Sequence, residues 1–242
     1  MFLKKALQSE KRYDTPKSLF NLNILFSLIY IQFPTFFITS SIKFYYYLME
    51  ALLSLISKCD TCAEKLQFGP RPIVSAHTKS KIVVIGQAPG SIVHKSGIPW
   101  DDKSGQNLRI WMGIDKEIFY NKEMIALMPM GFCYPGKGKS GDLPPIKECA
   151  PLWHKKILNK MTDVQLILLI GSFAQQYYLG NKAEKTLTET VRNYNKYLPE
   201  YSVLPHPSPR NNIWQAKNEW FKREVIPDLQ NLVQSILKIN KT

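Results

Sequence analysis

The chain has 242 residues, 45% of them hydrophobic, and a formal net charge of +13 at pH 7. Nothing in this composition suggests intrinsic disorder, and the length suits one domain or two small ones. The basic charge favours anionic partners such as nucleic acid or an anionic membrane surface, although a merely soluble basic protein could carry the same charge.

The first 48 residues differ from the remainder. Five basic residues within the first 17 precede a long apolar stretch, a pattern typical of a signal anchor or membrane helix. Three amides and Pro34 interrupt that stretch, and its composition is like that of translated AT-rich DNA. We therefore expect residues 1–48 to be a non-domain extension from a mis-assigned start, with Met49 as the working start. A membrane anchor is the alternative.

From Met49 onward, short apolar runs alternate with segments of helical spacing. Strands are predicted at 81–86, 124–130, 164–171 and 201–205. Helices are predicted at 104–113, 146–161, 173–179, 186–198 and 214–239, the last bent at Pro227. The alternation predicts one α/β domain at 49–242, with a parallel sheet covered by helices on both faces.

Two loops follow predicted strands. GQAPG at 86–90 comes after the first strand, and HPSPRN at 206–211 comes after the fourth. Prolines on both sides of His206 make its loop stiff, because proline fixes φ and lacks an N–H donor. Ligands bind at the carboxyl ends of parallel strands, so both loops are candidates for one functional site.

Four cysteines form a third pattern. Cys59 and Cys62 make a CxxC pair, while Cys133 and Cys149 flank a loop rich in proline and glycine. A redox or disulfide pair and small buried thiols are alternatives, although a structural disulfide is disfavoured in the cytoplasm, where we expect the protein. Four thiolates can also hold zinc or an iron–sulfur cluster. The spacing alone does not choose between these two.

Together these features resemble the uracil-DNA glycosylase superfamily. GQAPG resembles its first motif, and HPSPRN resembles its second in the form found in single-strand-selective enzymes. The cysteine spacing resembles family four, whose cysteines hold a 4Fe–4S cluster. The resemblance implies a three-layer α/β/α fold around a four-stranded parallel sheet. It also implies such a cluster, with zinc as the alternative, on Cys59, Cys62, Cys133 and Cys149.

The resemblance also implies roles for the motif residues. Hydrolysis of an N-glycosidic bond leaves an anionic base, which a neutral His206 could stabilise by donating a hydrogen bond. Trp100 is expected to stack on the extruded base. The residues expected to bind the substrate base are Gly86, Gln87 and Trp100. Those expected to bind DNA, by pinching phosphates or as a wedge in the emptied stack, are Pro89, Ser208, Pro209 and Arg210.

Several positions depart from the family pattern. Ala88 and Gln87 stand where relatives carry acidic or amide side chains, so the first motif supplies no general base. The stretch IPWDDKSGQNL resembles family five and selects Asp102 to position water, with helix capping as the alternative. Pro129 replaces the asparagine that reads uracil in family four. Gly90 replaces a bulky residue that excludes thymine, so uracil, a substituted uracil, hypoxanthine and xanthine all remain candidate bases.

These features predict a monofunctional DNA glycosylase that starts base excision repair. Its partner would be DNA with a damaged or deaminated base, and analogy implies a monomer whose core domain contacts no membrane. A non-catalytic or covalently trapping damaged-DNA-binding protein of the same fold is the alternative. Ala88 and Pro129 support that alternative, because both replace residues that act directly on the substrate.

Overall fold

The computed structural model describes residues 34–139 and 141–239, with side chains from Tyr45 onward. The chain divides into two compact units, 1–44 and 45–242. Most of the predicted extension at 1–48 therefore lies outside the residues whose side chains the structure describes. The start at Met49 stays a prediction. Within the described part of the chain, no helix combines the length and the apolar character needed to span a membrane.

Four parallel strands form the central sheet in the order β2-β1-β3-β4. Their bounds are Ile82–Ile85 for β1, Ile125–Leu127 for β2, Leu166–Ile170 for β3 and Tyr201–Leu204 for β4. Ile82 pairs with Ile125 on one side and with Leu166 on the other. All four residues of β1 are buried, as expected for a strand covered on both faces.

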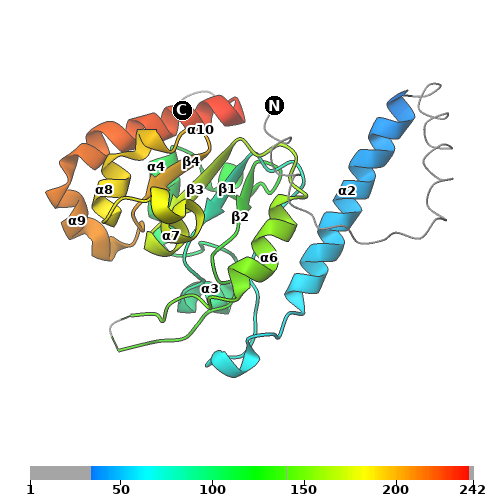
Figure 1. Cartoon of the computed structure of the whole chain (residues 1–242), viewed down its shortest axis with the longest axis horizontal. Helices are drawn as coiled ribbons and strands as arrows, with labels where there is room; N and C mark the ends of the chain where they lie inside the picture. The colour runs from blue at the N-terminus through cyan, green and yellow to red at the C-terminus, as the bar shows by residue number, and fades with distance from the viewer. Residues whose placement is uncertain (1–33, 140, 240–242) are drawn as a thin grey trace. The chain divides into compact units, whose positions relative to one another are not determined.

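Helices follow each strand and cover the sheet. Between β1 and β2 lie α3 (Ser91–Ser96), α4 (Lys103–Met112) and α5 (Lys116–Tyr120). Between β2 and β4 lie α6 (Cys149–Leu158), α7 (Ser172–Leu179), η3 (Gly180–Lys182), α8 (Leu187–Arg192) and η4 (Tyr194–Lys196). After β4 come η5 (Pro209–Asn211), α9 (Asn212–Lys217), η6 (Phe221–Val225) and α10 (Ile226–Leu237). Figure 1 shows α4 and α10 on one side of the sheet and α6 on the other, which confirms the three-layer α/β/α fold.

The single helix predicted at 214–239 is wrong. Helix α9 ends at Lys217, and the chain continues through the π-helical η6 into α10. The Asn218 side chain donates to the Trp214 carbonyl (2.8 Å) and accepts from the Trp220 indole (3.2 Å). Such local side-chain hydrogen bonds compete with the helical ladder, which explains the break. The helix predicted at 186–198 is likewise shorter, with α8 followed by η4.

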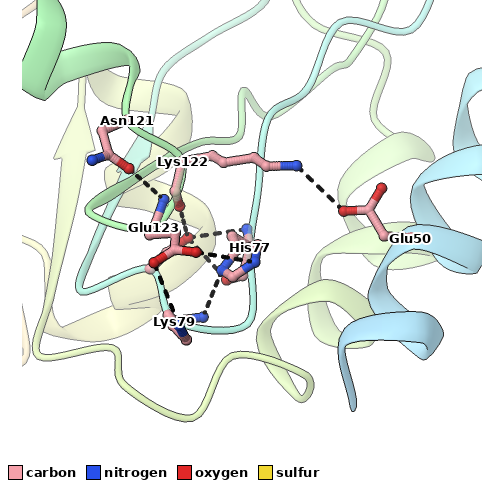
Figure 2. Close-up of polar contacts among 7 residues, drawn as sticks. Glu50, His77, Lys79, Asn121, Lys122 and Glu123 are labelled. Atoms are coloured by element: carbon pink, nitrogen blue, oxygen red, sulfur yellow. Dashed lines mark hydrogen bonds and ion pairs between the residues drawn. The ribbon is translucent and has the colours of Figure 1, made fainter. Parts of the chain in front are cut away.

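Residues 45–57 of α2 (Pro34–Ser57) belong to the 45–242 unit and pack against its core. Figure 2 shows Glu50 reaching Lys122, and Glu123 lying beside His77. The closest N···O distances are 3.4 Å and 3.8 Å, and the carboxylates are half exposed, so each pair contributes little. Burial of apolar side chains carries the packing instead, and those buried on α2 are Met49, Leu52 and Ile56.

Candidate active site

A cleft of about 930 Å³ opens at the carboxyl ends of β1 and β4, within the size range of ligand sites. It is lined by the 86–90 loop, the segment before α4, the His206 loop and the loop before α6. The predicted residues that it brings together are Gly86, Gln87, Pro89, Trp100, Asp102, His206, Ser208 and Arg210. Pro209 does not line the cleft and lies exposed at the start of η5 (Pro209–Asn211).

Trp100 is tightly constrained within the cleft. Its backbone has a left-handed φ of 58°, which is strained for a bulky residue. Its ring stacks on His206 with centroids 5.8 Å apart. A Cβ on Gly86 would lie 2.6 Å from the Trp100 ring, and a Cβ on Gly105 would lie 1.8 Å from the Trp100 carbonyl oxygen. Both glycines are therefore needed for Trp100 to lie where it does.

His206 is held neutral and fixed in place. Burial lowers its pKa, and the nearby Asp102 carboxylate only partly opposes that shift. The Asn107 side chain donates to the Pro207 carbonyl (2.8 Å), and the Asn211 side chain donates to the His206 carbonyl (2.7 Å). Sequence reasoning missed both amides as positioning residues, although Asn211 belongs to HPSPRN and Asn107 follows Asp102 by five positions.

Asp102 caps α4. One carboxylate oxygen accepts a hydrogen bond of 2.8 Å from the Gly105 backbone N–H, so the capping alternative is what the structure shows. Capping does not remove Asp102 from the site, because the residue also lines the cleft and its charge acts on His206. Its second oxygen has no hydrogen-bond partner in the described part of the chain.

A hairpin formed by residues 136–139 and 141–143 covers one side of the cleft. The Leu143 N–H donates to the Gly136 carbonyl (2.9 Å), and an antiparallel bridge joins Lys137 to Asp142. The Gln87 side-chain amide donates to the Leu143 carbonyl (3.4 Å). The hairpin is thus tied to the first motif.

Asp142 and Tyr134 are cleft residues that sequence reasoning missed. A Cβ on Gly90 would lie 3.4 Å from one oxygen of Asp142, so a carboxylate borders the space that we expected to be open. The Tyr134 hydroxyl donates to the other Asp142 oxygen (3.1 Å). The loop rich in proline and glycine was the only signal for this arrangement, and it did not indicate which side chains would face the cleft.

His154 fixes the backbone at Pro129, which also lines the cleft. Its Nε2 donates to the Pro129 carbonyl (3.0 Å), since a carbonyl can only accept. Its Nδ1 then accepts from the Tyr178 hydroxyl (2.7 Å). Burial lowers the pKa of His154 to about 4, so the ring is neutral. Sequence reasoning missed the buried His154–Tyr178 pair.

The four cysteines line a second, smaller cavity. The structure describes all four of them, and none forms a disulfide. The other lining residues are apolar, namely Leu66, Pro70, Pro72, Phe132, Ile146, Leu152 and Trp153. The Phe132 backbone N–H donates to the Cys149 sulfur (3.3 Å). The fold thus brings the Cys59/Cys62 pair next to the Cys133/Cys149 pair, although the two pairs are more than 70 residues apart in the sequence.

Comparison with known proteins decides the family. The model of the uracil DNA glycosylase superfamily matches residues 74–230, which contain both loops of the cleft. The chain belongs to the uracil DNA glycosylase superfamily. It is also 22% identical over 192 residues to the Type-4 uracil-DNA glycosylase of Thermotoga maritima, across 79% of this chain and 96% of that enzyme. The superfamily and family-four resemblance inferred from the motifs is confirmed.

The cysteine cavity contains four thiols, the donor type that both zinc and iron–sulfur clusters accept. In the described residues, no group of three or more His, Cys, Asp or Glu side chains is placed to hold a metal ion. The shared cavity and the backbone N–H donor to the Cys149 sulfur are nevertheless features of cysteine-held clusters. Burial raises the pKa of the Cys149 thiol to about 12, so thiolates in this cavity need a compensating positive charge.

Proposed function

We propose that this protein is a monofunctional DNA glycosylase that removes uracil or a related deaminated base from DNA, the first step of base excision repair. One observation carries the proposal: Asp102 and His206, from segments 104 positions apart, line the same cleft beside Trp100. Membership of the superfamily and similarity to a Type-4 enzyme support it.

The side chains of the cleft suggest how the bond would break. The extruded base would stack on Trp100, and neutral His206 would donate a hydrogen bond to the base oxygen that gains charge. The uncapped oxygen of Asp102 would hold the attacking water and take its proton as the hydroxyl adds to C1′. The electrons of the glycosidic bond leave with the base, which is stabilised as an anion by His206. The product is an abasic site.

The loops around the cleft would hold the DNA. We propose that Pro89 and Ser208 contact the phosphates beside the extruded nucleotide. Pro209 and Arg210 would fill the gap that it leaves, since both are exposed at the start of η5. The Ser208 hydroxyl accepts from the Arg210 N–H (3.3 Å), which orders this turn before DNA binds.

We also propose that the cysteine cavity holds a 4Fe–4S cluster on Cys59, Cys62, Cys133 and Cys149. Such a cluster would join the segment before β1 to the loop before α6, and its role would be structural. Zinc is the alternative. Iron and sulfide analysis separates the two, and the cluster protein should be brown whereas a zinc protein is colourless.

The function is tested with full-length, anaerobically purified protein. Labelled oligonucleotides with uracil, hypoxanthine, xanthine or no lesion, single- and double-stranded, are incubated with the protein and then treated with alkali. Strand breaks at one lesion establish the glycosylase and identify its base. DNA binding without breaks at any lesion favours the non-catalytic binder, which Ala88 and the capping role of Asp102 support. A stable protein–DNA adduct favours the trapping form of that binder.

A further inference from the structure

An exposed aromatic ring lies at the edge of the cleft and has no place in the proposed chemistry. Phe68 is 60% exposed, and its ring stacks on Tyr134 with centroids 5.6 Å apart and planes 19° apart. Tyr134 is buried and contacts the His94 ring (5.7 Å). Phe68 and Tyr134 both line the cleft that contains Trp100 and His206. His94 also contacts Phe68 (6.0 Å), so the three rings form one cluster in which Tyr134 is buried and Phe68 is open to solvent.

Contacts on either side hold Phe68 in this position. Its neighbour Leu66 is buried and lines the cysteine cavity. Gln67 accepts a hydrogen bond from the Lys137 backbone N–H (3.1 Å), which ties the segment to the hairpin. Beneath Phe68, the Tyr134 hydroxyl is bonded to Asp142. Phe68 is thus an exposed apolar ring on a segment whose neighbouring residues are fixed by burial and by a hydrogen bond.

Cationic side chains near the Phe68 ring are placed to bind the phosphates of a nucleic-acid strand. Lys95, Lys137 and Arg210 line the same cleft, and none of them forms an ion pair within the described part of the chain. The cleft also contains two carboxylates, Asp102 and Asp142, and each already accepts a hydrogen bond from the chain. Aromatic rings beside unpaired cations are the usual elements of single-strand binding sites.

We propose that Phe68 and Tyr134 form a stacking platform for an unpaired nucleotide next to the extruded base, so that single-stranded DNA is the preferred substrate. The proposal rests on the proposed function in one respect, that the target base enters the same cleft. A base inside a duplex has both faces covered by its neighbours, whereas a base in a single strand can offer one face to Phe68. Every base has such a face, so the platform would prefer unpaired strands without reading their sequence.

Binding of DNA by the full-length protein tests the platform without any need for turnover. Fluorescence anisotropy is measured with a labelled oligonucleotide containing a tetrahydrofuran abasic analogue, as a single strand and as a duplex. Phe68→Ala and Phe68→Leu should each weaken single-strand binding by roughly tenfold, the loss of one stacked base, and should change duplex binding less than twofold. Phe68→Trp should keep the wild-type affinity. Tyr47→Ala is the matched control, since Tyr47 is 66% exposed and does not line the cleft.

Thermal unfolding of the Phe68 variants should match that of the wild type, because the ring covers little of the core. The platform is overturned if the Phe68 variants lose equal affinity for single-stranded and duplex DNA. It is also overturned if Phe68→Leu binds single-stranded DNA as tightly as the wild type. A wild-type protein that binds the duplex more tightly than the single strand overturns it too. Absence of base release at every lesion would remove the proposed function but would leave this binding result standing, so the two failures are distinguishable.

Discussion

The four histidines show how burial sets protonation at the scale of the residue. Burial lowers the pKa of each of them, namely His77, His94, His154 and His206. The shift is largest for His154, from 6.5 to about 4. As the pH falls below 6.5, the unfolded chain takes up a proton at this position before the folded chain does. The stability linked to His154 is therefore complete above pH 6.5 and is lost towards pH 4.

This linkage predicts how His154→Gln behaves in denaturant titrations between pH 7.5 and pH 4. His154 should account for a loss of about 3 kcal/mol in the free energy of unfolding across that range. The variant keeps an amide that can donate to the Pro129 carbonyl, should be less stable at pH 7, and should show a flatter pH profile. A variant profile as steep as that of the wild type would contradict the assignment of a neutral, buried His154.

At the scale of the element, one hydrogen bond joins the two halves of the proposed catalytic machinery. Asp102 caps α4, and Asn107 on the same helix donates to the Pro207 carbonyl in the His206 loop. Loss of this bond should let the loop shift relative to Asp102, and small displacements of catalytic groups cost large factors in rate.

Asn107→Ala should lower kcat for base release by about tenfold or more while leaving KM for DNA nearly unchanged. Asn231→Ala, an exposed substitution on α10, serves as the control. A proportional rise in KM with an unaltered kcat would assign Asn107 to DNA binding and not to positioning.

The cysteine cavity, the segment before β1 and the hairpin are connected through Leu66 and Gln67. Cys133→Ala should therefore lower the iron content and also weaken single-strand binding by about as much as Phe68→Ala. The double variant should lose little more than either single variant, because both act on the same platform. Normal iron content in Cys133→Ala would count against a ligand role for that cysteine.

These elements also show what could be predicted from the sequence. Strands β1, β2 and β3 are continuous apolar runs, and β4 is interrupted only by Ser202. The stiff motif loops follow β1 and β4, so the sheet and the residues around His206 could be placed. Asp142, Tyr134 and Phe68 could not, because their positions depend on how irregular loops pack over the cleft and leave no periodic signal. The break at Asn218 was missed because its side-chain hydrogen bonds override a good helical pattern.

At the scale of the whole molecule, the net charge of +13 should make DNA binding strongly dependent on salt. Arg210→Ala should reduce the slope of log affinity against log salt concentration by about 1 if Arg210 contacts a phosphate. Phe68→Ala should weaken binding without changing that slope, because stacking releases no counterions. An unchanged slope in Arg210→Ala would instead favour the wedge role proposed above, in which the guanidinium contacts no phosphate.

The central claim is that Asp102 and His206 break the glycosidic bond in one cleft. The most direct measurement is single-turnover base release by the wild type, Asp102→Asn and His206→Ala, each at saturating protein on the best lesion. Asparagine is as good a helix cap as aspartate, so Asp102→Asn removes the acid and preserves the start of α4. The account predicts a rate loss of about 100-fold or more in both variants with DNA binding retained. Wild-type rates in both variants would contradict it.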